Sequence, residues 1–390
     1  MESQKRHSNQ IQFKYEEFIQ GERIPIYRES SGVDDVTALP RKPWARTGGL
    51  GTFIELLSTF QSERGMFVCE IPGGKSLEVQ HHLYEQLTLI LQGRGATEIW
   101  QEKGRKQMFE WGPGSLFAPP KNTYYRLHNG GPEPVILFGL TTAPRIMNGL
   151  DDIDIVFNSK YDFTDYYNGQ DDYFNQTNDR VTGGRYNSTT WYTNFISDVN
   201  KETVDDHEHK VSGGQLTGYR MAGQFPRGHI SEWPVGRYHK AHHHRPGAVL
   251  VGLKGNGYVN LWPKELGIHP WQDGHADKVV QVKWGPNSIY SPPDGWFHQH
   301  MSTGKVPARH VACYGGNYPL TSTRSSDGDN VIVPVREGGQ LIDYEDEDPE
   351  VRRYFIEANA KEGVECAMPP VKYRTEPLSP EALARLGVIG

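Results

Sequence analysis

Cysteine is scarce in this sequence, whose 390 residues include only Cys69, Cys313 and Cys366. Three scattered cysteines exclude a disulfide framework and a paired-cysteine zinc site. Clustered positive charge is also missing: 41 Lys and Arg stand against 48 Asp and Glu, which argues against nucleic-acid or anionic-membrane partners. The sequence has no apolar run of about 18 residues, and its N-terminus has no apolar signal segment. We therefore expect a cytoplasmic protein without a membrane or nucleic-acid partner.

Two residue types are abundant instead. Glycine accounts for 43 of the 390 residues, or about 11%, against about 7% in an average protein. Histidine occurs 16 times, and twelve of these residues lie between His207 and His310. This uneven distribution indicates that the second half of the chain carries the chemistry.

The chain contains an internal repeat. WGPGSLFAPP at 111–120 matches WGPNSIYSPP at 284–293, with six identical positions. Upstream, Gly93-Arg94-Gly95 aligns with Gly255-Asn256-Gly257, and a tryptophan follows seven residues after the first glycine in both copies. The second copy is longer between these motifs, which predicts an 11-residue surface insertion. Two copies indicate duplicated domains rather than a solenoid.

Each copy reads as short β-strands separated by Gly-, Pro- and Asn-rich turns, which predicts an all-β barrel or sandwich. In the tail, Asp348 and Gly363 fit the start and stop of a helix, and a shorter helix should start at Ser379-Pro380 and stop near Gly387. The expected segments are an N-terminal arm at 1–60, a first domain at 61–145, an inter-domain segment at 146–215, a second domain at 216–320 and a helical tail at 321–390.

The histidines of the second copy have the spacing of a metal site. Alternation along a strand places His242 and His244 on one face and His243 on the other, and it places Trp296, His298 and His300 together. If both segments line one barrel, three or four imidazoles converge, and imidazole suits iron, copper, nickel and zinc. The competing interpretations are a structural role or an adventitious surface metal patch.

These residues resemble the cupin superfamily of small β-barrels, which is marked by HxHx3–4Ex6G followed by PxGx2Hx3N. The second copy gives His242-x-His244 and Gly255, then Pro293-x-Gly295-x-x-His298. Because the resemblance covers both copies, it implies a bicupin: two tandem double-stranded β-helix (jelly-roll) barrels with an arm and a short helical tail.

The second copy departs from this pattern at the acidic ligand, where Ala248 stands, and Ser302 occupies the final Asn position. The remaining ligand set, His242, His244 and His298, is similar to that of iron-dependent cupin dioxygenases. The resemblance therefore implies Fe(II)- and O2-dependent oxidation of a small anionic or phenolic metabolite. Two alternatives stay open: a non-redox isomerase, lyase or decarboxylase that uses zinc, nickel or manganese, and a binding protein without catalysis.

Further residues are candidates for the substrate pocket. Arg245 directly follows the ligand strand and has the geometry to hold a carboxylate, while Trp296 and His300 share the face of His298. A surface arginine and simple core packing are the competing interpretations. For six other histidines we expect only surface or structural roles: His207, His209, His229, His269, His275 and His310.

The first copy has lost most of the ligand pattern. Its matching positions are Gln80, His82, Gln86 and Tyr125, with Glu85 one residue out of register. One histidine with two amides and a phenol is a poor divalent-metal site. We therefore expect a degenerate site in the first domain, one metal ion per chain, a small-molecule substrate and a homo-oligomer.

Overall fold

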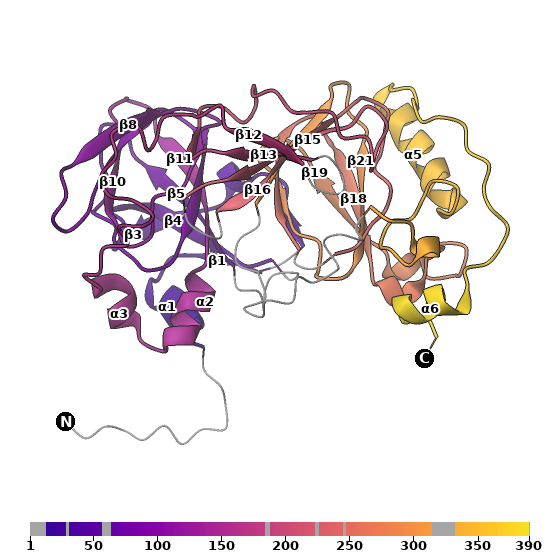
Figure 1. The fold of residues 1–390 in the computed structure, drawn as a ribbon, viewed down its shortest axis with the longest axis horizontal. Helices are drawn as coiled ribbons and strands as arrows, with labels where there is room; N and C mark the ends of the chain where they lie inside the picture. Colours follow the sequence, from indigo (N-terminus) through magenta and orange to yellow (C-terminus); the bar gives the residue numbers. More distant parts are fainter. Residues whose placement is uncertain are drawn as a thin grey trace, which may run out of the picture.

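The computed structural model describes residues 13–28, 31–56, 64–183, 188–222, 226–244, 247–313 and 332–389. Two β-sandwiches lie side by side (Figure 1), and each pairs an eight-stranded sheet with a three-stranded sheet. This is the double-sheet architecture of jelly rolls, so the all-β, two-domain prediction is confirmed. Among the described residues, no helix combines the length and apolarity that crossing a membrane requires.

The first sandwich has a large sheet ordered β1-β4-β5-β11-β6-β9-β14, with β3 beside β4, and a small sheet ordered β10-β7-β8. The strands are β1 Ile26–Tyr27, β3 Lys42–Trp44, β4 Gly49–Ile54, β5 Gly65–Ile71, β6 Gln86–Gln92, β7 Gly95–Trp100, β8 Gln107–Trp111, β9 Leu116–Phe117, β10 Tyr124–His128, β11 Val135–Thr141 and β14 Phe195–Ile196.

The second sandwich repeats this plan with a large sheet ordered β12-β13-β15-β16-β22-β17-β20-β2 and a small sheet ordered β19-β18-β21. The strands are β2 Gly32–Val33, β12 Arg180–Gly183, β13 Ser188–Tyr192, β15 Gln215–Arg220, β16 Arg227–Trp233, β17 Val249–Lys254, β18 Gly257–Trp262, β19 Val280–Trp284, β20 Ile289–Tyr290, β21 Phe297–Ser302 and β22 Ala308–Cys313.

The duplicated turns have the same backbone conformation. Gly93 and Gly255, the first glycines of the repeated motif, both have positive φ, at 85° and 74°. In the repeated WGP block, Gly114 (φ 85°) corresponds to Asn287 (φ 62°). Glycine and asparagine are the residues that enter this region most readily, so the one non-conservative difference in that block keeps the same turn.

The two sandwiches share an apolar core between their large sheets. On one side it contains Val68 and Phe138, and on the other Val251 and Val311. Because side chains alternate along a strand, the residues between these face the interiors of the barrels. On β22, Val311 faces the shared core, whereas His310 lies on the opposite face and lines the second barrel.

The N-terminal segment is more than the connecting arm expected from the sequence. Its strands β1, β3 and β4 belong to the first large sheet, while β2 pairs with β20 in the second. The inter-domain segment also joins both sandwiches, since β14 pairs with β9 and β13 with β15. Short strands from these connections therefore extend both sheets and tie them together.

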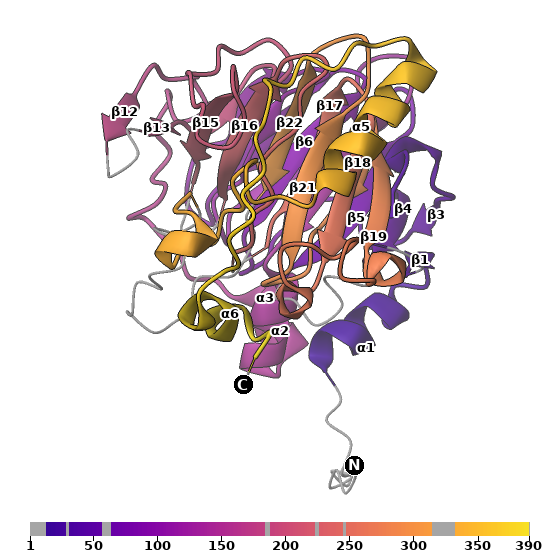
Figure 2. The same cartoon turned by 90° about the vertical axis from the view of Figure 1, so that its right-hand side faces the viewer.

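The helices lie outside the sandwiches. Figure 1 shows α1 (Lys14–Gly21), α2 (Ala143–Leu150) and α3 (Ile153–Asn158) gathered below the first sandwich. Figure 2 shows α5 (Pro349–Glu362) across the small sheet of the second, with α6 (Pro380–Leu386) lower down. The predicted tail helices are confirmed: Asp348 and Ser379 cap the N-termini, and Gly363 and Gly387 follow the C-termini with positive φ.

Candidate metal centre in the second barrel

His242 and His298 are held opposite each other by the backbone. The His242 amide donates to the His298 carbonyl at 3.1 Å, and the His298 amide donates back at 2.9 Å. His244 joins them, and the three residues offer ligand nitrogens that all lie within 4.8 Å of one another. The structure therefore brings together the three histidines that the spacing predicts.

Two of these imidazoles have a defined tautomer. Nδ1 of His242 lies 3.0 Å from the Lys240 carbonyl oxygen, and Nδ1 of His298 lies 3.1 Å from the Trp296 carbonyl oxygen. Because a carbonyl only accepts, each Nδ1 carries the hydrogen, so Nε2 is the ring nitrogen whose lone pair can bind a metal. Metal-ligating histidines are commonly oriented by such outer hydrogen bonds.

Burial keeps these imidazoles neutral. His242 and His298 are 2% and 4% exposed, and desolvation lowers the pKa of both well below the usual 6.5. A neutral imidazole is the form that binds a metal. His244 is less buried, which places it closest to solvent among the three.

A methyl group stands where the family pattern has a carboxylate. Ala248 is buried and lines the same cavity as the three histidines. Among the described residues, the histidine cluster includes no Asp, Glu or Cys. The donor set is therefore three imidazole nitrogens, which suits a divalent transition metal and leaves coordination positions for small ligands.

Lys210 was not anticipated from the sequence. Its Nζ lies 2.8 Å from Nε2 of His242, and burial lowers the pKa of the amine to about 8. Its carbonyl oxygen accepts a hydrogen bond from the Lys240 amide at 2.7 Å, which fixes Lys210 beside the ligand segment. A positive charge at this position favours an anionic substrate.

Four more histidines line the cavity. His300 follows His298 on the same face of β21, as the alternation predicts, and Nδ1 of His300 lies 2.9 Å from the Tyr290 hydroxyl. His239 lies on the ligand segment. His229 and His310, for which only surface or structural roles were expected, also line the cavity because β16 and β22 turn both toward it.

β16 and β22 lie outside the repeated motifs, so the spacing of those motifs could not reveal that His229 and His310 line the cavity. The available signal was the alternation of His229, Ser231 and Trp233 on β16, all of which line the cavity.

The other pocket candidates are placed differently. Trp296 is partly buried, packs against the apolar core of the barrel and contributes its carbonyl oxygen to His298, but its ring does not line the cavity. Arg245 lies outside the described residues. Lys210 is therefore the cation that the described part of the cavity wall contains.

The first barrel has the same backbone arrangement with other side chains. The Gln80 amide donates to the Tyr125 carbonyl at 2.8 Å, and the Tyr125 amide donates back at 3.0 Å. This reciprocal pair corresponds to His242 and His298 and thus supports the alignment of the two copies. His82 takes the place of His244.

The side chains of the first barrel satisfy one another. Nδ1 of His82 lies 2.8 Å from the Tyr84 carbonyl oxygen, so Nε2 accepts from the Tyr125 hydroxyl, which is also at 2.8 Å. Gln86 lies 3.3 Å from the same hydroxyl and donates to Thr88 at 3.0 Å. The single histidine nitrogen that could bind a metal already has a partner.

No family model matches the sequence, and no curated protein matches it. The structure is similar to solved structures of Bacillus subtilis oxalate decarboxylase. One, concerned with the Mn(II) centres of that enzyme, is 13% identical with a TM-score of 0.46 and covers 75% of this chain and 78% of that chain. A mutant of the same enzyme is 11% identical with a TM-score of 0.47, and the match covers 82% of this chain and 87% of that chain. Similarity of this extent carries no activity, substrate or metal over to this chain.

Proposed function

We propose that this protein is a metal-dependent enzyme of the cupin type whose second barrel acts on a small anionic substrate. The supporting observation is the set of three imidazoles, two with fixed tautomers, that meet beside Lys210 in one cavity. His242, His244 and His298 would hold the divalent metal. When bound, the metal would act as a Lewis acid or a redox centre.

The residues of this chain would then prepare the substrate. Lys210 binds its carboxylate or enolate oxygen by a charge-assisted hydrogen bond. The methyl of Ala248 leaves the site without an anionic ligand, so the metal and Lys210 together present net positive charge to that group. The buried walls exclude water, which strengthens both attractions.

Two reaction classes fit this site. The three-histidine set favours Fe(II)- and O2-dependent oxidation, the class that the sequence resemblance implies. Lys210 favours the second class, non-redox decarboxylation, lyase or isomerase chemistry with zinc, nickel or manganese, because an ammonium group stabilises the anion that such reactions develop.

Metal analysis tests the proposal. Wild-type protein purified without added chelator should contain about one transition-metal ion per chain, and His242→Ala and His298→Ala should lose it. His209→Ala, which changes an exposed histidine, is the matched control. If His242→Ala keeps its metal, the metal is not held by the three histidines, which would favour the alternative of a binding protein without catalysis. Oxygen uptake with carboxylate substrates then separates the two reaction classes, because only the first consumes O2.

A further inference from the structure

The cavity of the second barrel contains a second polar surface beyond the histidine cluster. It consists of Trp233, His239 and His310, which we call the inner patch, and all three line the cavity. Among the described residues, no hydrogen-bond partner exists for Nε1 of Trp233, for either ring nitrogen of His239 or for Nε2 of His310. Their side chains are 1%, 8% and 0% exposed.

The inner patch is continuous and separate from the proposed ligands. Trp233 contacts both histidines, with ring centroids 4.4 Å from His239 and 5.0 Å from His310. His300 lies between the patch and the cluster, 5.3 Å from His239 and 5.6 Å from His298. One imidazole ring therefore separates the inner patch from the histidine cluster. A small organic acid is long enough to span this separation.

Buried polar atoms without partners are costly. Each such atom destabilises the fold by about 1–3 kcal/mol, and native proteins pair nearly all of them with protein, water or ligand. Four such atoms on one wall of a cavity indicate a site for a polar group that enters from the cavity.

The chemistry of the inner patch limits what that group can be. The Trp233 indole only donates, whereas a neutral imidazole offers one donor and one acceptor. Burial lowers the pKa of His239 well below its usual value and that of His310 to about 3, so both are neutral. No carboxylate lines the described part of the cavity. A neutral group that both donates and accepts, as a hydroxyl does, matches this surface.

We propose that the inner patch binds a hydroxyl group at the far end of the substrate, which is therefore a small hydroxycarboxylate. Its carboxylate lies at Lys210 and the histidine cluster, and its hydroxyl lies against Trp233, His239 and His310. This inference rests on the proposed function for the position of the carboxylate. It adds the substrate class and the residues that select it.

Matched pairs of acids test the inference by isothermal titration calorimetry on metal-loaded protein. The probes are γ-hydroxybutyrate against butyrate and β-hydroxypropionate against propionate. The hydroxylated member of at least one pair should bind about tenfold more tightly to the wild type, the difference expected for one good hydrogen bond. His239→Phe, which keeps an aromatic ring without nitrogens, should reduce that ratio to about one and leave binding of the plain acid within about twofold.

His239→Gln, which keeps a donor and an acceptor, should restore the preference. If His239→Phe fails to fold, Trp233→Phe and His239→Gln decide the question by the same ratio. Equal binding of both members, or binding of neither, would overturn the inference, because bound water would then satisfy the patch. A hydroxyl preference that survives loss of the ring nitrogens would also overturn it, because the hydroxyl would then be recognised elsewhere. Metal content measured on the same samples separates the two proposals: a wild type without metal contradicts the proposed function, whereas metal and carboxylate binding without hydroxyl preference contradicts only the inner patch.

Discussion

Nζ of Lys210 lies 2.8 Å from Nε2 of His242, the nitrogen that would bind a metal. The ammonium group therefore donates to the same lone pair that a metal would use. If a metal takes that lone pair, Lys210 needs another acceptor nearby, and the carboxylate of the proposed substrate would supply one. The proposed function therefore links metal loading to anion binding through this one side chain.

Replacement of Lys210 tests this link. Lys210→Met keeps the length of the side chain and removes the charge, so the Kd for butyrate should rise about tenfold to a hundredfold, the equivalent of one charge-assisted hydrogen bond. Metal content should be equal to or higher than that of the wild type, because no ammonium competes for His242. Calorimetry and metal analysis measure the two quantities.

Lys283→Met provides the control, since Lys283 is exposed on β19. It should change neither quantity. A Lys210→Met protein that lost its metal but bound butyrate normally would contradict the assigned role.

The sequence predicted the parts of the site that repeat a motif. His242, His244 and His298 followed from spacing and alternation, and the structure brings them together. Lys210 and His310 could not be predicted, because their positions depend on how distant strands pair across the barrel. His229 was missed for the same reason, although its alternation with Ser231 on β16 was visible in the sequence.

The tail also has one feature that the sequence predicted and one that only the structure shows. Its helices were predicted from local capping residues, which act within a few positions of the chain. Its pairing with the ligand segment is a long-range contact: Ile342 donates to the Ala241 carbonyl at 2.8 Å, and the His243 amide donates to Gln340 at 3.1 Å. No local pattern encodes such a pairing, so only the structure shows that the tail supports the site.

A buried carboxyl group in the tail should give the protein a measurable pH dependence. Glu347 is 3% exposed and hydrogen-bonded to Tyr238 and Gln299, and burial raises its pKa from 4.5 to about 8. The folded protein thus binds a proton that the unfolded chain releases. This contribution to stability is complete below about pH 4.5 and is lost as the pH rises toward 8.

Glu347→Gln removes this titration. The variant should match the wild type near pH 5 and become more stable than it by on the order of a few kcal/mol near pH 9. Urea unfolding at several pH values measures the difference. Glu357→Gln, an exposed change on the nearby helix α5, should show no such trend, and a parallel pH dependence of Glu347→Gln and wild type would refute the assignment.

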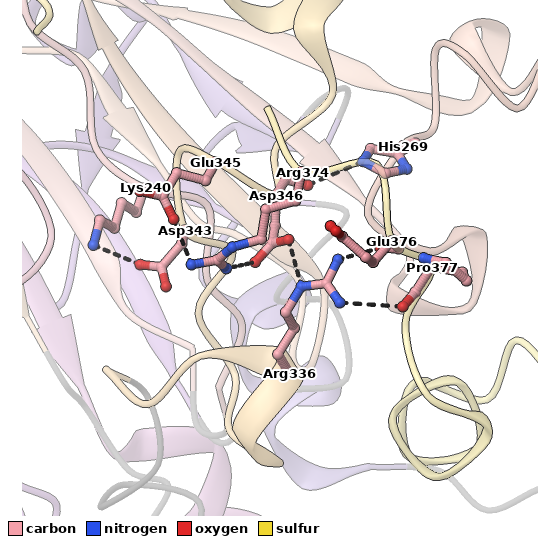
Figure 3. A network of polar contacts seen from close by, with 9 residues as sticks. All are labelled: Lys240, His269, Arg336, Asp343, Glu345, Asp346, Arg374, Glu376 and Pro377. Atoms are coloured by element: carbon pink, nitrogen blue, oxygen red, sulfur yellow. Dashed lines mark hydrogen bonds and ion pairs between the residues drawn. The ribbon is translucent and has the colours of Figure 1, made fainter. Parts of the chain in front are cut away.

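Asp346 holds the tail together. Figure 3 shows its carboxylate between two guanidinium groups, with Arg336 Nε at 2.5 Å and Arg374 Nη1 at 2.6 Å. Arg336 also donates to the carbonyl oxygens of Glu376 and Pro377. The side chain of Asp346 is only 5% exposed, so its loss leaves two cations without their shared partner.

Asp346→Asn should lower the free energy of unfolding by about 1.5–3 kcal/mol, the range for hydrogen bonds to charged groups. Because the tail pairs with the ligand segment, the variant should also release metal faster to a chelator. Asp171→Asn removes an exposed ion pair with Arg105 and should cost less than about 1 kcal/mol. If both variants unfold at the same urea concentration, the network of Figure 3 does not stabilise the tail.

The first barrel offers the strictest test of the comparison between the two copies. Gln80 and Tyr125 form the reciprocal backbone pair that His242 and His298 form in the second barrel, and His82 stands in the position of His244. The backbone for a three-histidine site is therefore present, and the two barrels differ at two of the three ligand positions. The double variant Gln80→His with Tyr125→His removes the hydroxyl that occupies Nε2 of His82 and supplies the two missing imidazoles. Metal analysis should show a rise from about one to about two ions per chain, while Gln80→His alone should remain near one because Tyr125 still occupies His82. A double variant that folds and still holds a single ion would show that the side-chain loss is not what distinguishes the two barrels.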